Sequence, residues 1–201
     1  MCQLFETIRI AHGVPERLPF HNARMNRSRK ALFGCDDLID LQRVISVPDK
    51  FRQGVVKCKV TYAESTAEVT FTPYTPREIR TLQLVVCDEV DYSHKYANRA
   101  SLDELKARAS VDEIIIVKNG FITDTSFSNL VFFDGKEWIT PTTPLLQGTM
   151  RQFLLEQNII KEKPIRVTDL QRFSSLKLIN AMLPFSQSAD IQTDNILPSQ
   201  V

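Results

Sequence analysis

The sequence predicts an α+β protein built from two small lobes. Segments rich in β-branched and aromatic residues alternate irregularly with segments of helical spacing, and no regular strand–helix–strand repeat joins them. A stretch with prolines at positions 73 and 76 interrupts this pattern, which is typical of a linker. We therefore expect an N-terminal lobe over residues 1–73, a linker over 74–79 and a C-terminal lobe over 80–201.

Composition and charge favour an ordinary globular protein. The chain has 201 residues, 43% of them hydrophobic and 24% charged, and its formal net charge is +1. This balance gives no electrostatic reason to expect nucleic acid or a membrane surface as a partner. No apolar run approaches the ~20 residues of a membrane helix, and the N-terminus does not read as a signal peptide. We expect a cytoplasmic protein.

Cysteines and histidines are scattered without a ligand pattern. Cys2, Cys35, Cys58 and Cys87 form no CxxC pair, and the three histidines do not complete a zinc-ligand spacing. We expect reduced thiols and no metal site. The chain also lacks the glycine-rich phosphate loop, the dinucleotide fingerprint and the GxSxG nucleophile turn.

The N-terminal lobe is predicted to mix strands and helices. Residues 4–10 favour a strand, and residues 20–34 have helical spacing that ends at Gly34. Asp36 and Asp37 predict the start of a second helix over 36–47. Residues 54–63 and 66–74 predict a β-hairpin.

The C-terminal lobe is predicted to be richer in strands. A strand within 82–90 precedes a short helix at 101–109, and Asn119-Gly120 and Asp134-Gly135 mark two further hairpins. A helix near 150–157, a strand near 164–167 and an apolar segment over 176–185 follow.

The polar groups with chemical potential are weak signals when taken one at a time. Lys95 alone is most often a solvated lysine, Arg24 a surface or ion-paired arginine, and Asp124 a turn cap. Gly148 alone is a helix entrance whose amides favour an anion. Their order is more informative, because Lys95 precedes G-F-I-T-D-T-S-F-S-N-L (120–130), then a T-P dipeptide and L-L-Q-G-T-M-R (145–151).

This order resembles the class IV aminotransferases, the fold-type-IV pyridoxal-phosphate enzymes. The matches are L-F-E-T-I-R-I, His21 to Arg24, Lys95 to Arg99, residues 120–130, 139–141 and 145–151, and I-N-A-M-L-P (179–184). The resemblance implies the two-lobed D-amino-acid aminotransferase architecture, with a small N-terminal α/β lobe. Its larger C-terminal lobe is a β-rich pseudobarrel that carries the Schiff-base lysine. Pyridoxal 5'-phosphate is the implied cofactor.

The resemblance also implies a role for each matching residue. Lys95 is the Schiff-base lysine and moves the proton at the substrate's α-carbon. Asp124 stands where the family has the glutamate that keeps the pyridine nitrogen protonated, and Arg24 is the phosphate arginine. The further cofactor-binding candidates are Ser128, Asn129, Gly148, Thr149, Met150, Asn180 and Ala181, and the substrate-binding candidates are Thr7 and Arg99.

Three departures from the family pattern stand out. Asp124 is one methylene, roughly 1.5 Å, shorter than glutamate. Gln147 and Met150 replace a proline and a threonine of the phosphate loop, so a hydroxyl is lost while the amide is kept. Family members usually carry a glycine-rich segment before the first strand, whereas this sequence begins almost at that strand.

The reaction is left open between two enzymes and a third possibility. The K-Y-A-N-R and I-N-A-M-L-P segments favour a 4-amino-4-deoxychorismate lyase, which eliminates pyruvate and forms 4-aminobenzoate in folate biosynthesis. The alternatives are an aminotransferase for D- or branched-chain amino acids and a catalytically impaired ligand-binding homologue. The resemblance implies a small-molecule amino substrate and a homodimer with a shared active site.

Overall fold

The computed structural model describes residues 2–199, which form two compact units. Unit 1 runs up to Pro76 and includes His94–Asn98, and unit 2 comprises Arg77–Ser93 and the chain from Arg99 onward. The chain passes from unit 1 to unit 2 within the predicted linker. Each unit has its own hydrophobic core, so we describe them one at a time.

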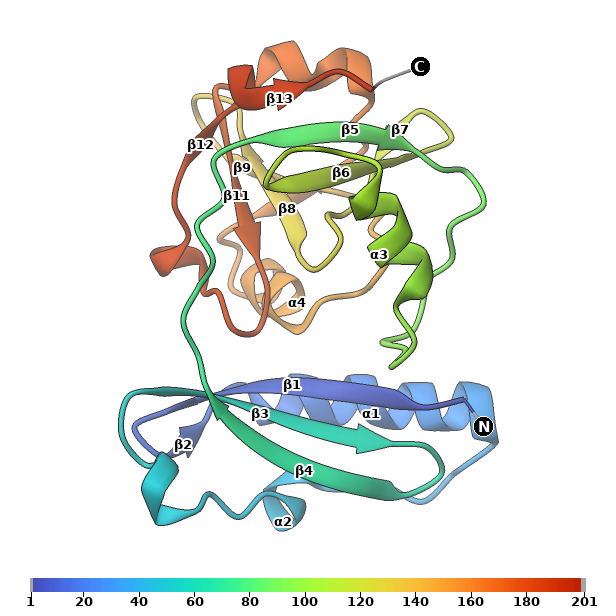
Figure 1. Cartoon of the computed structure of the whole chain (residues 1–201), viewed down its shortest axis with the longest axis vertical. Helices are drawn as coiled ribbons and strands as arrows, with labels where there is room; N and C mark the ends of the chain where they lie inside the picture. Colours follow the sequence, from blue (N-terminus) through green and yellow to red (C-terminus); the bar gives the residue numbers. More distant parts are fainter. Residues whose placement is uncertain (1, 200–201) are drawn as a thin grey trace. The chain divides into compact units, whose positions relative to one another are not determined.

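Unit 1 is an antiparallel sheet covered by a long helix (Figure 1). The strand order is β2-β1-β3-β4, with β1 at Leu4–Ala11, β2 at Val14–Pro15, β3 at Val55–Tyr62 and β4 at Thr66–Pro73. Leu4, Ile8 and Ile10 alternate along β1 and are fully buried against Met25. This period of two confirms the predicted first strand, and the predicted β3–β4 hairpin is confirmed by its register.

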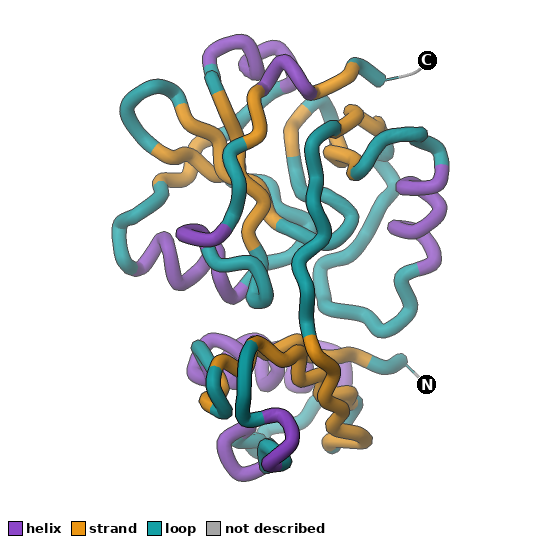
Figure 2. Tube along the Cα trace, turned by 60° about the vertical axis from the view of Figure 1, so that its left-hand side comes forward, coloured by secondary structure: helices purple, strands orange, loops and turns teal. Residues whose placement is uncertain are grey.

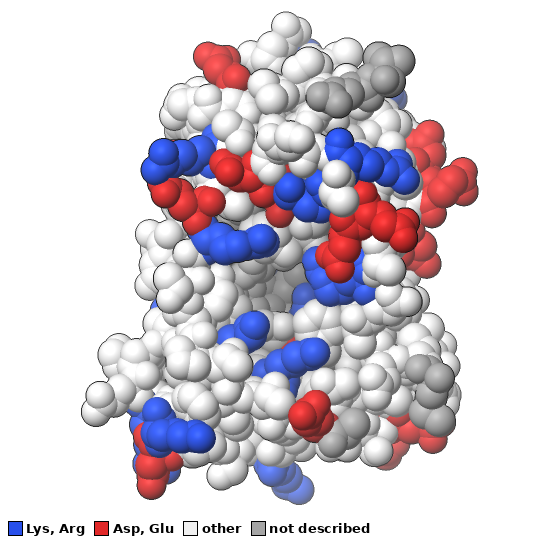
Figure 3. All heavy atoms as spheres, in the orientation of Figure 1, with Lys and Arg blue, Asp and Glu red and all other residues white. Residues whose placement is uncertain are grey.

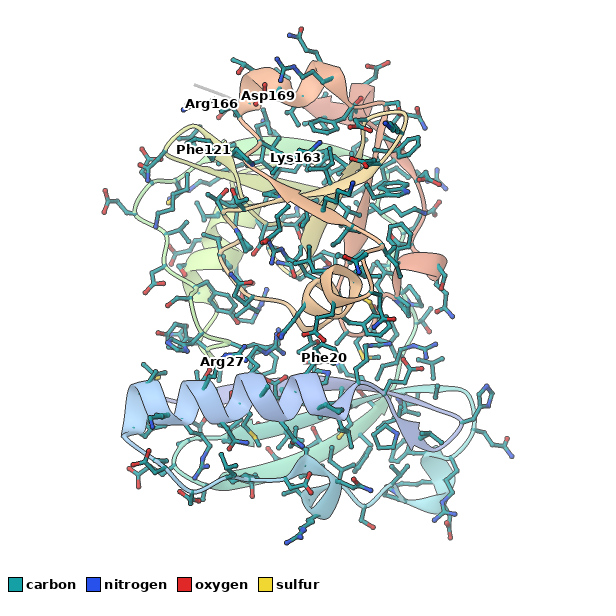
Figure 4. All side chains as sticks on the ribbon, turned by 180° about the vertical axis from the view of Figure 1, so that it is seen from behind. Phe20, Arg27, Phe121, Lys163, Arg166 and Asp169 are labelled. Carbon is teal, nitrogen blue, oxygen red and sulfur yellow. The ribbon has the colours of Figure 1, made fainter. Side chains whose placement is uncertain are left out.

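The helix of unit 1, α1, spans Leu18–Phe33 and begins two residues before its predicted start. Its end is as expected, because Gly34 adopts a left-handed conformation with φ of 68° and donates its amide to the last turn. Phe20 and Arg27 lie on the side of α1 that is turned away from the strands of unit 1 (Figure 4). The strands of unit 1 and the turns of α1 can be followed in Figure 2.

The predicted second helix over 36–47 is wrong in its length and its cap. The structure forms only a single turn, α2, at Leu41–Val44, and its N-cap is Asp40 rather than Asp36 or Asp37. Asn26 on α1 holds the preceding segment extended, since its side chain accepts from Ile39 N (3.0 Å) and donates to Ile39 O (2.9 Å). These tertiary hydrogen bonds outweigh the helical spacing of the apolar residues.

The Lys95 segment lies at the edge of β1 and not with the strands that surround it in sequence. Phe5 N donates to Lys95 O at 3.0 Å, and Ala97 N donates to Gln3 O at 2.8 Å. These bonds pair the first half of β1 on the edge that β2 leaves open. The structure therefore groups residues 94–98 with unit 1, whereas the sequence placed the lysine in the C-terminal lobe.

Unit 2 is built from two sheets packed face to face. The β8 sheet has the order β10-β9-β8-β11-β12, and the β5 sheet has the order β13-β5-β6-β7. In Figure 1 the strands of one sheet cross those of the other steeply. Leu84 and Ile115 of the β5 sheet share one core with Phe132 and Leu176 of the β8 sheet.

The bounds of the elements in unit 2 follow the predicted order. The strands are β5 (Leu82–Val86), β6 (Glu113–Lys118), β7 (Phe121–Ile122), β8 (Asn129–Phe133), β9 (Trp138–Pro141), β10 (Lys161–Lys163), β11 (Ser175–Ile179), β12 (Ile191–Gln192) and β13 (Ile196–Leu197). The helices are α3 (Ala100–Ala107) and α4 (Thr149–Glu156). Short 3₁₀ turns occupy Asp49–Phe51 in unit 1 and Val167–Arg172, Phe185–Gln187 and Thr193–Asn195 in unit 2.

Two connections in unit 2 decide the direction of its strands. Asn119 and Gly120 have φ of 51° and 77°, which is the geometry of a two-residue hairpin turn, so β6 and β7 are antiparallel as predicted. In contrast, β5 and β6 are parallel and are joined through α3, a crossover that the sequence reading did not anticipate.

The strand predicted near residues 164–167 is wrong in position. The structure forms β10 immediately before it, at Lys161–Lys163, and leaves only an isolated bridge between Phe121 and Arg166. Pro164 carries no amide hydrogen, which limits pairing at that point. The Arg166 guanidinium instead lies 4.3 Å from the centre of the Phe121 ring, and both side chains can be seen in Figure 4.

Helix α4 packs on the β8 sheet and thereby fixes the position of its own first turn. Met150 and Leu154 are buried against Val131 and Ile179.

On the face of unit 2 that Figure 3 shows, lysines and arginines are interspersed with acids, as the net charge suggests. Among residues 2–199, no helix combines the length and apolar character needed to cross a membrane.

Replacing Asn26 by alanine tests the tertiary hydrogen bonds that displace the predicted second helix. We expect Asn26→Ala to lower the free energy of unfolding by about 1–3 kcal/mol, because both backbone groups of Ile39 lose their partner. Urea denaturation followed by circular dichroism measures the loss. Arg27→Ala, on the exposed side of the same helix, is the matched control, and equal stability of the two variants would contradict this explanation.

Candidate functional site

The predicted site residues divide between the two units. Thr7, Arg24 and Lys95 belong to unit 1. The remainder belong to unit 2, namely Arg99, Asp124, Ser128, Asn129, Gly148, Thr149, Met150, Asn180 and Ala181. The site is therefore described as two groups of side chains, one in each unit.

Lys95 is half-buried and rests on an aromatic ring. Its Nζ lies 4.8 Å from the centre of the Phe5 ring, and Lys59 Nζ lies 5.2 Å from the same centre. Thr7 is on the same side of β1 as Phe5 and is directly opposite Lys59 in the register. The lysine, the threonine and a second ammonium thus lie on one face of the unit 1 sheet, away from its core.

Arg24 is at the centre of a buried charged cluster. Arg24 Nε donates to Glu6 Oε1 at 2.9 Å, and Arg24 Nη2 donates to Glu6 Oε2. His21 Nδ1 lies 2.6 Å from the same Oε2. Because a carboxylate oxygen only accepts, we assign the proton to Nδ1. Glu6 and His21 are fully buried, and Arg24 is 6% exposed.

Arg24 and His21 decide the charge of Glu6. Burial by itself would raise the pKa of Glu6, but Arg24 and His21 outweigh it and lower that pKa to about 2. The pKa of His21 is lowered, because its own burial is stronger than the attraction of Glu6. The cluster is thus a bidentate carboxylate–guanidinium pair completed by a histidine hydrogen bond.

This cluster gives Arg24 a structural partner that the sequence reading missed. One edge of its guanidinium is held by Glu6, so binding of phosphate by Arg24 stays a prediction. A signal for Glu6 was present in the sequence. It alternates with Leu4 and Ile8 on the core face of β1, where a carboxylate needs a cation.

Removing the charge of Glu6 tests this cluster. We expect Glu6→Gln to lower the free energy of unfolding by about 3–5 kcal/mol, because it leaves Arg24 buried without its counter-charge. Asp36→Asn, which breaks the exposed pair with Lys30, should leave the free energy of unfolding almost unchanged, because solvent screens that pair. Urea denaturation of both variants measures the contrast, and losses of similar size would show that the buried pair is not a stabilising unit.

In unit 2, Asp124 is a buried acid surrounded by hydrogen-bond donors. It is 5% exposed, and its Oδ2 accepts from Leu146 N at 2.9 Å while its Oδ1 accepts from Asn129 Nδ2 at 2.7 Å. Burial raises the pKa of Asp124 to about 6, and the two donors together with the charge of Arg151 only moderate that rise. The acid is therefore able to change its protonation state near neutral pH.

Asn129 links this acid to the loop before α4. Its Nδ2 also donates to Leu146 O at 2.9 Å, and its Oδ1 lies close against Gly148. Asn129 is the first residue of β8, so a rigid strand holds the amide in place.

The turn between Asp124 and β8 is fastened from two sides. Ser126 N donates to the buried Glu113 at 3.2 Å, and Ser126 O accepts from Arg99 Nη2 at 2.8 Å. Thr125 Oγ1 accepts from Ser128 N within the turn. Arg99, predicted to contact substrate, thus supports the backbone that follows the acid, and its substrate role stays a prediction. Glu113 was missed by the sequence reading.

Ser128 and Asn180 are brought together by strand pairing. Asn180 Nδ2 donates to Ser128 Oγ at 2.8 Å, and Asn180 Oδ1 accepts from the backbone N–H of Met182 and Leu183. Ala181 lies inside the turn that these bonds close. The I-N-A-M-L-P segment is thus an asparagine-stabilised turn beside the end of β8.

Gly148, Thr149 and Met150 form the start of α4. Gly148 is the N-cap residue and makes no side-chain cap, while Thr149 and Met150 are buried. Arg151, which the sequence motif contained without a predicted role, is buried and donates to Thr140 Oγ1, Pro141 O and Glu162. It therefore fastens the first turn of α4 to β9.

These residues suit a ligand that carries both an anionic group and an aromatic ring with a basic nitrogen. The positive end of α4 favours a phosphate, and a buried acid favours a protonated ring nitrogen. A lysine on an aromatic ring supplies an amine. Within unit 2, Asp124 and the start of α4 therefore suit the ring nitrogen and the phosphate of pyridoxal phosphate, and the role of Lys95 of unit 1 toward that cofactor stays a prediction.

Comparison with known families decides the assignment. The family model described as amino-transferase class IV matches residues 3–189. The chain belongs to the class IV aminotransferases. Enzymes of this family depend on pyridoxal phosphate, which confirms the predicted cofactor. The family match and the similar solved structures confirm the predicted fold.

Individual relatives support this membership. An uncharacterized protein of Haemophilus influenzae is 38% identical over 185 residues, which are 90% of this chain and 98% of that protein. A crystal structure from Haemophilus somnus 129pt, provisionally assigned as a 4-amino-4-deoxychorismate lyase, is 34% identical with a TM-score of 0.85. The match covers 92% of this chain and 98% of that chain.

A more distant structure shares the fold. A hypothetical aminotransferase from Mycobacterium tuberculosis, in its PLP-bound form, has a TM-score of 0.76 and 19% identity. The match covers 94% of this chain and 80% of that chain. At this identity the similarity is evidence for the architecture.

Titration of Asp124 gives a prediction for the cofactor-free protein. Between its ordinary pKa of 3.8 and the folded value of about 6, the folded state holds more protons than the unfolded state. The contribution of Asp124 to stability should therefore be fully present below pH 4 and decline by about 3 kcal/mol as the pH rises through 6. Urea denaturation between pH 4 and 7 measures this decline. Asp124→Asn should abolish it, whereas Asp194→Asn, at an exposed position, should leave it unchanged.

Proposed function

We propose that the protein is a pyridoxal-phosphate-dependent lyase of the 4-amino-4-deoxychorismate lyase type. The observation that carries the proposal is the match over 98% of the length of the Haemophilus somnus structure provisionally assigned to that activity, at 34% identity. The product of the reaction would be 4-aminobenzoate, with release of pyruvate. The substrate would be a small amino-bearing ring compound, and its aromatisation would drive the elimination.

Lys95 and Asp124 have separate tasks in the proposed reaction. When bound, the cofactor supplies an electron sink for the negative charge that develops at the substrate's α-carbon. Lys95 removes the α-proton, and its place against the Phe5 ring keeps the amine partly shielded from water. Asp124 stabilises a protonated ring nitrogen, and its ionised form is in turn favoured by that positive charge.

The phosphate would be held at the start of α4. The amides of Thr149 and Met150 are at the positive end of the helix, and Gly148 precedes them without a side chain. Ser128 and Asn180 hold the adjoining turn in position. Thr7 is our candidate for substrate contact in unit 1, because it shares a sheet face with Phe5 and Lys59.

An aminotransferase is the second candidate. A structure from Thermotoga maritima, provisionally assigned as a branched-chain amino acid aminotransferase, shares the fold at 19% identity and a TM-score of 0.74. Both reactions begin with removal of the same α-proton. They differ in their later steps, because a transaminase needs a keto acid as its second substrate and the lyase does not.

We also propose a homodimer located in the cytoplasm. The shared active site of the homodimer is implied by the resemblance to the family. The cytoplasmic location is in keeping with four cysteines that are free in the structure, of which Cys58 is buried. Sedimentation equilibrium of the purified protein tests the dimer.

Lys95 is the residue whose replacement tests the proposed chemistry. We expect borohydride to fix pyridoxal phosphate onto Lys95, as mapped by peptide mass spectrometry. We expect Lys95→Ala to lose at least about 10³-fold in turnover of 4-amino-4-deoxychorismate, since no other group replaces its base. Lys59→Ala, the other lysine over Phe5, is the matched control and should still form the adduct.

Three outcomes separate the alternatives. Formation of pyruvate and 4-aminobenzoate without a keto acid supports the lyase. Turnover of D- or branched-chain amino acids that requires a keto acid, with no lyase product, would replace it by the aminotransferase. Absence of any adduct would leave a catalytically impaired ligand-binding homologue.

A further inference from the structure

The side chain of Asn129 closes a ring of hydrogen bonds between groups of the protein. Asn129 Nδ2 donates to Asp124 Oδ1 at 2.7 Å and to Leu146 O at 2.9 Å. Leu146 N donates to the other oxygen of Asp124 at 2.9 Å. The strand β8, the acid and the loop before α4 are thereby joined through three residues.

Both amide hydrogens of Asn129 are used in this ring. A primary amide has two N–H bonds, and these two bonds point to Asp124 and to Leu146. No donor of this side chain is left for a phosphate or a ring oxygen. The expectation that Asn129 itself binds the cofactor is therefore not the role that this geometry favours.

Gly148 provides the room that this arrangement needs. A Cβ placed on Gly148 would lie 1.8 Å from Asn129 Oδ1, which is far inside the contact distance of any two atoms. The backbone of Gly148 has φ of −69° and ψ of 142°, a conformation open to every residue. The glycine is thus required by the close approach of Asn129 and not by its own backbone dihedrals.

We propose that Asn129 is a positioning residue that fixes the Asp124 carboxylate and the start of α4 as one rigid piece. The inference rests on the proposed function, in which Asp124 faces a ring nitrogen and the α4 start faces a phosphate. Asn129 acts through both groups and touches neither the cofactor nor the substrate. Gly148 is its counterpart, because any side chain there would push the amide away.

The chemistry of an amide suits this task. Asn129 carries no charge, so it orients Asp124 without an ion pair that would hold the acid permanently ionised. Its hydrogen bond to the ionised carboxylate still favours that form over the protonated one. Loss of this bond should therefore make Asp124 harder to ionise and loosen the loop at Leu146 at the same time.

The test uses the full-length protein and two readouts that do not depend on turnover. The first is the dissociation constant of pyridoxal phosphate, measured by quenching of tryptophan fluorescence. The second is the pH midpoint of the stability decline in the cofactor-free protein. Asn129→Ala should weaken cofactor binding about tenfold and move the midpoint upward by about one pH unit. Asn129→Leu, which is close in size but has no donor and no titrating group, should move the midpoint at least as far.

A double substitution distinguishes this role from general destabilisation. Gly148→Ala alone should reproduce both changes, since its methyl group displaces Asn129. Adding Asn129→Ala to it should cause no further loss, because the smaller side chain leaves space for that methyl group. Thr143→Ala removes a bond to Ile122 O from the same loop and should change neither readout.

The results that would overturn the inference are separate from those that would overturn the function. An unchanged pH midpoint in Asn129→Ala, or losses that multiply in the double variant, would show that Asn129 does not position the acid. If the unmodified protein binds no pyridoxal phosphate, the proposed function fails. The pH midpoint would then still decide the role of Asn129, and if Gly148→Ala does not fold, the two Asn129 variants carry the test.

Discussion

Each unit of this protein buries a carboxylate, and a buried charge must be stabilised by hydrogen bonds or opposite charges within the fold. Asp124 is stabilised by the neutral donors Asn129 and Leu146, and the charge of Arg151 adds to their effect. Glu6 is stabilised by hydrogen bonds from Arg24 and His21. The two arrangements have different consequences. The charge of Arg24 and the hydrogen bond of His21 keep Glu6 ionised at every ordinary pH, whereas the neutral donors leave Asp124 able to respond to a charge brought near it.

Several elements of unit 2 together fix the position of the Asp124 carboxylate. Asp124 follows the hairpin of β6 and β7 in the chain. The next turn is held by hydrogen bonds from Ser126 to Glu113 and from Arg99 to Ser126. Packing of α4 against the β8 sheet then sets the loop whose backbone meets the carboxylate. Asn129 joins the carboxylate to this loop through its two amide hydrogen bonds, and the missing side chain of Gly148 leaves room for it.

The sequence predicted most of the strands because their burial alternates plainly or their turns carry an Asn-Gly or Asp-Gly pair. It failed at 36–47, where Ile39 is held by hydrogen bonds from Asn26, 13 residues earlier in the chain. Motif order predicted that Lys95, Asp124 and Gly148 belong to one site, which stays a prediction, and in the structure Asn129 contacts both the acid and the loop before α4. The partners Glu6, Glu113 and Arg151 were missed, because a lone charged residue in a strand or helix does not reveal which buried group it will meet.

The placement of residues 94–98 on the edge of β1 has a practical consequence for how the chain can be divided. Unit 1 is not one continuous stretch of polypeptide, because the segment that caps its sheet edge arrives only after the first strand of unit 2. A fragment ending at Pro76 would expose Gln3 O and Phe5 N, an open edge of the kind that recruits neighbouring chains. Fragment complementation, circular permutation and fusion designs would therefore have to keep the Lys95 segment together with β1.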